Sequence, residues 1–353
     1  MNPTQTPRRD PIRAVRTPGG LSVRYRPQAL ITGTACALAA LAVSVAALGS
    51  GDFPLGPAEV VRALAGAGDP AADFIVNELR LPRVVTALLT GAALALSGAI
   101  LQALVRNPLG SPDILGLTQG AASGALLVVA AGGGSLALAG GAVVGGAGAG
   151  LLIWVLAWRQ GVPGHRLVLV GIGLAAVLTG VNGYLLTRVK LMEAARALLW
   201  LTGSLDGRGW EDALPLLALL TVLVPVVLLL CGPGLRLLEM GDDAACALGV
   251  PIVRLRLALL AAAVLLASAA AAAAGPVSFV ALTAPQLARR LTRAPGHNLV
   301  PSVVMGAALL VTADLAAQQA FGGRQLPVGV VTGVLGGGYL VWLLATQHRA
   351  GRL

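Results

Sequence analysis

Residues that usually carry catalysis are sparse in this chain of 353 residues, and they stand far apart. A nucleotide-binding P-loop needs a lysine followed by serine or threonine, but the chain's only lysine, Lys190, is followed by Leu191. The three cysteines have no C-x-x-C spacing, so we expect them to be small packing residues. They form neither a metal motif nor a disulfide framework. They are Cys36, Cys231 and Cys246. We therefore expect no catalytic residue, no metal site and no cofactor held by this chain.

One acid, Asp314, stands inside a long apolar segment. An ionisable side chain in such a segment is costly unless it is paired or hydrated, which makes Asp314 a candidate functional residue. Two roles are open, a proton relay and a hydrogen-bonded structural role between helices. A relay needs further acids or histidines at the same depth, whereas the three histidines fall in loops or in the tail. These are His165, His297 and His348. The structural role is therefore favoured.

Two arginines, Arg80 and Arg83, stand three residues apart around Pro82, a residue suited to a first helical turn. This spacing lets both side chains project from one side of the predicted helix. The positive end of a helix dipole does not favour cations, so another interaction should hold them there. Anchoring at a membrane interface and pairing with carboxylates of a partner protein are the two interpretations.

The composition places these residues in a membrane protein. Apolar residues make up 56% of the chain and charged residues 11%, whereas about a quarter of the residues of soluble proteins are charged. The 47 glycines and the 3% aromatic content favour helices that approach closely through small side chains. Arginines punctuate the apolar runs and do not form one basic patch, which argues against nucleic-acid binding despite the net charge of +10.

Ten apolar runs are long enough, or nearly so, to be membrane-spanning helices. They cover residues 28–49, 81–105, 113–132, 135–157, 166–187, 213–231, 257–275, 278–291, 299–320 and 326–346. The eighth run is too short to span alone and follows Gly275 and Pro276, so we expect a broken or re-entrant entry buried within protein. The predicted fold is an all-α polytopic membrane protein of about ten transmembrane helices.

An even number of spans places both termini on one side, and the charges indicate which side. With the termini inside, the inner segments hold 17 basic and five acidic residues, while the outer segments hold eight and nine. The positive-inside rule therefore predicts cytoplasmic termini. The predicted domains are a disordered cytoplasmic tail at 1–27, one transmembrane domain at 28–346 with an inner loop at 236–256, and a cytoplasmic tail at 347–353.

Five motifs within this domain resemble a known family. They are RLPR at 80–83, GAALALSG at 91–98, RNPLGSPDILG at 106–116, GPVSFVALTAPQLAR at 275–289 and QLPVGVVT at 325–332. Together they are similar to the FecCD/BtuC-type permease subunits of type II ABC importers for iron-siderophores, haem and cobalamin. The resemblance covers about residues 30–346 and implies that family's fold, with ATP and Mg²⁺ bound by separate ATPase subunits.

The resemblance also implies that the inner loop carries a coupling helix that docks on the ATPase. Asp242 and Asp243 favour a helix N-terminus, and Gly249 followed by Pro251 ends the helix. Without the resemblance, an amphipathic surface turn would be the better interpretation. The predicted coupling residues are Glu239, Met240, Gly241, Asp242, Asp243, Ala244, Leu248 and Gly249.

On the outer side, the resemblance implies that Arg80 and Arg83 receive glutamates of a substrate-binding protein. Relatives often carry an arginine where this chain has Gln318, so the third docking charge is assigned to Arg324 in the same outer loop. Residues that line the transport pathway are expected on spans two, five and eight and on outer re-entrant segments. They are Leu96, Gln102, Leu199, Trp200, Thr202 and Thr283.

Gln286, where many relatives have histidine, and residues 324–329 look most like permeases for ferric catecholate siderophores. The implied assembly sits in the bacterial inner membrane. It contains a second homologous permease, in a heterodimer or a homodimer, two copies of an ATPase and an extracytoplasmic binding protein. Hydroxamate siderophores, haem and cobalamin stay open as substrates. An ion-coupled secondary transporter would need several intramembrane charges, and an intramembrane enzyme a nucleophile with a base, so the sequence favours neither.

Overall fold

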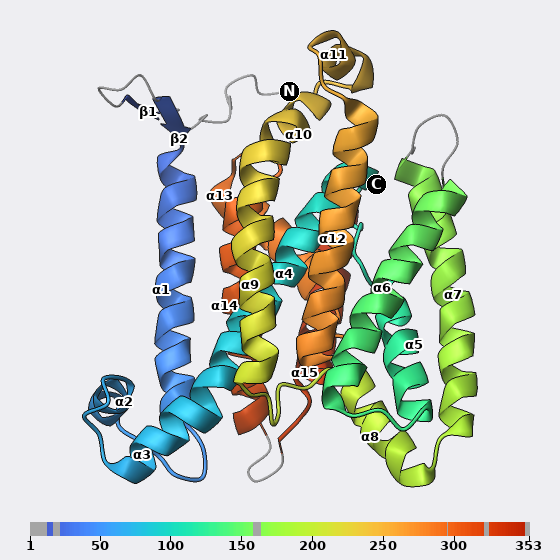
Figure 1. Ribbon diagram of the computed structural model, residues 1–353. Helices are drawn as coiled ribbons and strands as arrows, with labels where there is room; N and C mark the ends of the chain where they lie inside the picture. The colour runs from blue at the N-terminus through green and yellow to red at the C-terminus, as the bar shows by residue number, and fades with distance from the viewer. Residues whose placement is uncertain (1–12, 17–21, 158–163, 295, 321–324, 350–353) are drawn as a thin grey trace.

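The computed structural model describes residues 13–16, 22–157, 164–294, 296–320 and 325–349. Most of these residues belong to helices that run between two ends of a single bundle (Figure 1). A short antiparallel ribbon, β1 (Arg13–Arg16) and β2 (Ser22–Tyr25), precedes the first long helix. It lies in the stretch for which the sequence predicts a disordered tail.

Ten apolar helical segments correspond to the ten predicted spans, which confirms the predicted all-α polytopic fold within the described residues. They are α1 (Pro27–Gly49), α4 (Leu81–Val105), α5 (Leu117–Ala130), α6 (Ser135–Ala157), α7 (Gly164–Arg188), α9 (Trp210–Pro225) continued by η2 (Val226–Cys231) and α10 (Gly232–Leu238), α12 (Ile252–Ala274), α13 (Val280–Thr292), α14 (Leu299–Gln319) and α15 (Val328–Arg349). By length and hydropathy, seven helices of the described part can cross a membrane, and α5 and the segment Val328–Leu343 are shorter apolar helices.

Short helices and turns mark the two ends of the bundle (Figure 1). Helices α2 (Pro57–Leu64), α3 (Pro70–Phe74) and α8 (Leu191–Leu201) lie at one end, called here the α8 end. Helix α11 (Asp242–Ala247) lies at the opposite end, called here the α11 end, where α1 begins and α15 finishes. This arrangement agrees with an even number of crossings.

Helix α4 begins earlier than the sequence predicts, because α3 and the π-helical segment η1 (Ile75–Arg80) lead into it without a break. The continuous helix therefore starts at Pro70, and Arg80 and Arg83 lie within it and not at its start. Segment η1 ends two residues before Pro82, and η2 ends two residues before Pro233. Proline has no backbone N–H and crowds the preceding turn, so a widened turn lets the helix continue past it.

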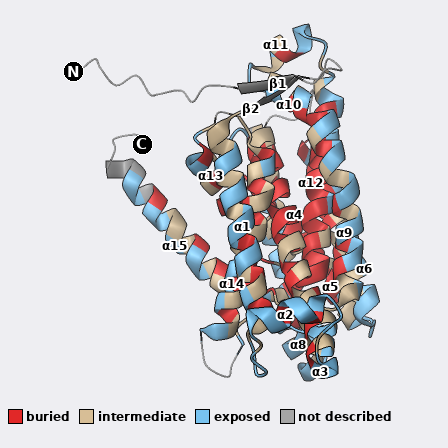
Figure 2. Ribbon diagram, turned by 90° about the vertical axis from the view of Figure 1, so that its left-hand side faces the viewer, coloured by how far each residue is buried: buried red, intermediate tan, exposed pale blue. Residues whose placement is uncertain are grey.

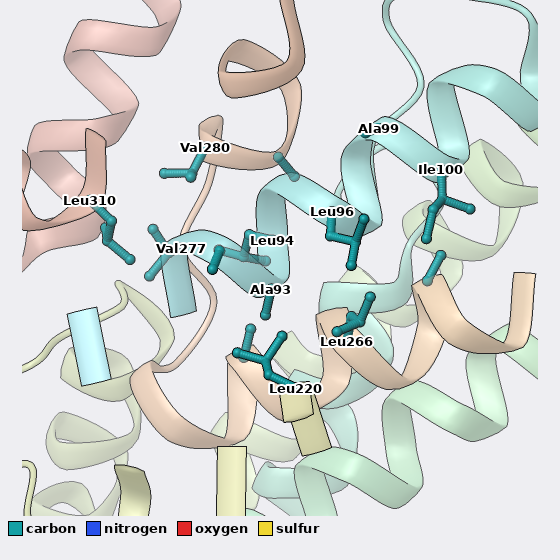
Figure 3. Packing of buried hydrophobic residues seen from close by; sticks show 14 of the residues in the cluster. Ala93, Leu94, Leu96, Ala99, Ile100, Leu220, Leu266, Val277, Val280 and Leu310 are labelled. Carbon is teal, nitrogen blue, oxygen red and sulfur yellow. The ribbon is translucent and has the colours of Figure 1, made fainter. Parts of the chain in front are cut away.

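The core forms around α4, which is buried along most of its length (Figure 2). Leu94 and Ile100 of α4 belong to one buried cluster with Leu220 of α9, Leu266 of α12 and Leu310 of α14 (Figure 3). Helices α4 and α14 approach closely through glycine: a Cβ atom at Gly91 would overlap the carbonyl oxygen of Gly306. The small residues predicted to bring helix backbones together therefore do so at the centre of the bundle.

The expected break before the eighth span is confirmed. Helix α12 ends at Ala274, and α13 begins at Val280 after a non-helical stretch in which Gly275 and Phe279 have positive φ angles of 73° and 68°. Protein covers this stretch, since the amide of Ser204 donates to the carbonyl of Ala274 at 2.9 Å. Irregular backbone at this depth is tolerated where neighbouring segments bury it and supply hydrogen bonds.

Candidate functional site

At the α8 end, Arg83 of α4 forms a two-pronged ion pair with Asp314 of α14. Its Nε and Nη2 atoms donate to the two carboxylate oxygens at 3.1 and 3.0 Å. The side chains are 14% and 1% exposed, respectively. A carboxylate buried this deeply requires such a partner, because an unpaired charge there would be strongly destabilising. Arg83 is therefore the partner in the hydrogen-bonded structural role predicted for Asp314. The resemblance to known permeases instead implies a pairing of Arg83 with glutamates of a binding protein.

Three further polar side chains surround this pair. Gln318 donates to Asp314 at 2.7 Å, Arg83 Nη1 donates to Gln325 Oε1 at 2.8 Å, and the exposed Asp206 lies 3.5 Å from the same nitrogen. The amide of Gln318 satisfies the buried acid without adding a charge. The network joins α4, α14, the residues just before α15 and the loop after α8.

Arg83, predicted as a docking residue, is thus paired within the chain. Arg80 is also engaged within the chain, since its two terminal nitrogens donate to the carbonyls of Leu48 and Phe53, each at 2.7 Å. Both guanidinium groups hold neighbouring segments together. The third predicted docking residue, Arg324, lies outside the described residues.

At the α11 end, the short helix α11 confirms the helix expected over the inner loop, with Gly241 as N-cap and Asp242 and Asp243 in its first turn. The exposed face of this region carries Met240, Asp243 and Leu248, together with Gly249 at a φ of 83°. Two apolar side chains and a charge on such a short protruding helix form a surface that a partner protein can cover.

Asp242 points toward the bundle instead. Arg106, the residue after α4, donates to its Oδ1 at 2.6 Å, and Arg256 of α12 donates to both carboxylate oxygens at 3.0 and 2.9 Å. Glu239, one of the predicted coupling residues, lies 2.8 Å from Nδ1 of His297, in the connection before α14. Burial lowers the pKa of His297, while Glu239 opposes this shift. The remaining predicted residues Gly241 and Ala244 form the turn and body of α11.

A cavity of about 300 Å³ lies at the α11 end, between the ends of α4 and α10, helices α12 and α13 and the loop before α14. Gln102, Arg256, Arg289 and His297 are among its lining residues. Gln102 donates to the carbonyl of Leu282 at 3.1 Å and accepts a hydrogen bond from Arg289. These contacts tie the last turns of α4 to α13.

Gln286, the residue used to suggest a catecholate permease, has a structural contact in this region. Its side-chain amide donates to the carbonyl of Pro108 at 2.8 Å. This bond links α13 to the turn that follows α4. The side chain of Gln286 is buried, so in this conformation it offers almost no surface to a substrate.

The predicted pathway residues divide into two groups. Leu96, Gln102 and Thr283 are buried within the bundle, and Gln102 also lines the cavity of about 300 Å³ at the α11 end. Leu199 and Thr202 are exposed at the end of α8, and Trp200 beside them is half-buried. Trp200 also lines a second cavity, of about 570 Å³, between α5, α6, α8 and α9.

Sequence reasoning missed two other polar contacts between helices. Asn182 of α7 accepts a hydrogen bond from Ser123 of α5 at 2.6 Å. Arg290 of α13 lies over the rings of Tyr339 and Trp342 of α15, 5.8 and 5.5 Å from their centroids, in a cation–π contact. For the contact of Asn182, a polar residue within an apolar run was the available sequence signal, but only the tertiary structure reveals its partner. In the described part of the chain, no three histidine, cysteine or acidic side chains gather to hold a metal ion.

The fold and these two polar ends define a multi-pass helical membrane protein with the architecture of a transport permease. Over residues 38–346 the chain matches the FecCD transport family, and it belongs to that family. The resemblance drawn from the five motifs is confirmed. This is a family of ABC transporter permease subunits, which are transport components.

Relatives and a solved structure agree with this membership. The ferric enterobactin transport system permease protein FepG of Escherichia coli (strain K12) is 46% identical over 321 residues, covering 91% of this chain and 97% of the relative. The achromobactin transport system permease protein CbrC of Dickeya dadantii (strain 3937) is 42% identical, covering 88% and 90%. A structure described as an inward-facing conformation of a metal-chelate type ABC transporter matches with a TM-score of 0.78 at 27% identity, covering 90% of this chain and 99% of that one.

Proposed function

We propose that this chain is the permease subunit of an ABC importer that carries a ferric siderophore, of the catecholate type, across the bacterial inner membrane. The observation that carries the substrate proposal is the 46% identity to a ferric enterobactin permease over nearly its whole length. The chain itself performs no covalent chemistry, and partner ATPase subunits bind ATP and Mg²⁺. Transport follows alternating access, in which ATP-driven movement of the ATPases changes the side to which the pathway opens.

Two copies of an ATPase dock at the α11 end, which we place in the cytoplasm together with both termini. The exposed apolar side chains of Met240 and Leu248 and the exposed Asp243 support this proposal, because they protrude from the bundle and lack a covering segment among the described residues. An apolar centre with a charge at its rim is the usual composition of such an interface.

A second, homologous permease completes the pathway in a heterodimer. Helix α15 diverges from the bundle toward its last residues (Figure 2) and exposes Val334, Leu335 and Trp342. The pathway then lies between the two permeases, and its lining includes the exposed Leu199 and Thr202 and the adjacent Trp200. An extracytoplasmic binding protein delivers the siderophore at the α8 end. Arg80, Arg83 and Arg324, the last of which lies outside the described residues, are the candidates for docking charges.

Reconstitution tests this function. The chain, its permease and ATPase partners and the binding protein are placed in liposomes, and ATP-dependent uptake of a ferric catecholate is compared with that of a ferric hydroxamate, haem and cobalamin. We expect ATP-dependent uptake of the catecholate, and no ATP hydrolysis by the isolated chain. Preference for haem or cobalamin would overturn the substrate proposal. Uptake driven by an ion gradient without ATPase would overturn the importer class.

A further inference from the structure

The first turn of α11 carries two adjacent acids whose surroundings differ. Asp243 is exposed, whereas the carboxylate of Asp242 accepts hydrogen bonds from Arg106 at 2.6 Å and from Arg256 at 2.9 Å. Arg106 also donates to the carbonyl of Leu238 at 3.2 Å, at the end of α10. One carboxylate therefore joins the start of α11 to two helices of the core, α4 and α12.

Helix α11 depends on such contacts for its position. It has only six residues, and Gly241 and Gly249 flank it at positive φ angles of 104° and 83°. A helix this short is not stable by itself, and glycine linkers on both sides give it little stiffness. The buried Ala245 packs α11 on the core, and α11 contacts α10 and α12. The ion pairs of Asp242 add a charged connection from the first turn of α11 to Arg106 and Arg256.

The carboxylate of Asp242 is partly in water. The side chains of Arg106 and Asp242 are 55% and 42% exposed, and that of Arg256 is 16% exposed. An ion pair in contact with water has a small net energy, so the pair with Arg106 contributes little to the stability of the fold. Removing the carboxylate should therefore leave the bundle folded while it frees α11. That separation between folding and mechanical connection makes the role of Asp242 testable.

We propose that Asp242 is a positioning residue that transmits displacement of α11 to α4 and α12 through Arg106 and Arg256, and that it is not a contact with the ATPase. Glu239 lies close to this connection, 2.8 Å from Nδ1 of His297. The proposal rests on the proposed function, because it concerns how ATPase movement reaches the permease. Asp243, on the exposed face, has no part in this connection.

The first experiment measures the mobility of α11 directly. Cys246 is exposed on α11, so a nitroxide attached to it reports local motion; Cys36 is replaced by alanine, and Cys231 is buried. Asp242→Asn should narrow the electron paramagnetic resonance spectrum of the label, whereas Asp243→Asn should leave it unchanged. Both variants remove one charge from the same first turn, so they share any effect on the helix dipole. Equal spectra for the two variants would overturn the proposal.

The second experiment measures coupling in the reconstituted importer. Asp242→Asn should lower ferric catecholate uptake per ATP hydrolysed by about five-fold or more, while ATPase co-purification stays normal. Asp242→Glu should restore most of the uptake, and Asp243→Asn should leave the ratio unchanged. Loss of ATPase binding in Asp242→Asn would instead identify a docking contact and overturn the proposal.

A double-mutant cycle completes the test. Replacing Arg106 and Arg256 by glutamine should reproduce the effect of Asp242→Asn, and adding Asp242→Asn should produce no further loss. Additive losses would show that the three residues act independently and would overturn the proposal. If the unmodified chain neither binds an ATPase nor supports uptake, the proposed function fails; if it does both and Asp242→Asn transports normally, only the role of Asp242 fails.

Discussion

At the scale of single residues, the contact between Arg83 and Asp314 changes the role inferred for both side chains. Arg83 was a candidate for docking and Asp314 for a relay, but each satisfies the other in a buried ion pair. Breaking a buried pair leaves one uncompensated charge, which costs far more than an exposed pair contributes. Asp242 differs from Asp314 because its side chain is 42% exposed and its partner Arg106 is 55% exposed, so water can solvate both charges.

We predict that Asp314→Ala lowers the free energy of unfolding by about 3–5 kcal/mol, because Arg83 then lacks its counter-charge. The thermal midpoint and the amount of protein in the membrane would measure the loss. Replacing Arg83 by methionine together with Asp314 by leucine should recover most of it. An Asp314→Asn variant that stays folded but loses uptake would support a proton relay and contradict the structural role.

The Arg83–Asp314 pair also determines how reversing the charge at Arg83 affects the amount of folded protein. We predict that Arg83→Glu lowers the amount of folded protein, because two carboxylates would then face each other at a buried site. Arg80→Glu should have a weaker effect, since Arg80 bonds only backbone carbonyls, those of Leu48 and Phe53. Quantitative detection of the protein in membrane fractions checks both variants. Normal abundance with lost uptake in Arg83→Glu would restore the docking interpretation.

At the scale of elements, the position of α4 against α14 sets the geometry of the α8 end. The two helices approach through Gly91 and Gly306, and this contact fixes the register that places Arg83 beside Asp314. Widened turns before Pro82 and Pro233 let two helices continue past residues that would otherwise break them. Small residues and prolines therefore act here as determinants of helix register and length.

We predict that Gly91→Leu destabilises the protein by about 1–3 kcal/mol, because the side chain would overlap the backbone of α14 and push the helices apart. Gly180→Leu in α7 is the matched control, since a Cβ atom at Gly180 meets nothing within 4 Å. Thermal unfolding in detergent compares the two. Similar midpoints for both variants would show that α4 and α14 do not depend on this close approach.

At the scale of the whole molecule, the two ends of the bundle differ in character. The α11 end carries a protruding helix with ion pairs to the core, and the α8 end carries short helices around a buried acid (Figure 1). Apolar side chains are exposed between the ends on α6, α7 and α15, as expected for surfaces that face lipid or another membrane subunit. This difference between the two ends fits a protein that receives the transported ligand at one end and contacts an ATPase at the other.

We predict that the α11 end faces the cytoplasm. In cells, a membrane-impermeant maleimide should label Cys246 only after the membrane is permeabilised, with Cys36 replaced by alanine. A cysteine introduced for the exposed Met192 on α8, in a chain that also lacks Cys246, is the control and should be labelled in intact cells. The reverse pattern would overturn the orientation derived from the positive charges.

The sequence by itself determined the number of spans, the broken eighth span, the helix at 242–247 and the family. These depend on local properties, such as the length of apolar runs, the position of Gly275 and motif spacing, which a single stretch of chain carries. Only the tertiary structure decided the partners of the charged residues. Arg83 and Asp314 are 231 positions apart, and Asp242 meets arginines that follow α4 and lie on α12. Such pairings depend on how one helix is set against another, and the hydropathy of each helix leaves that register open.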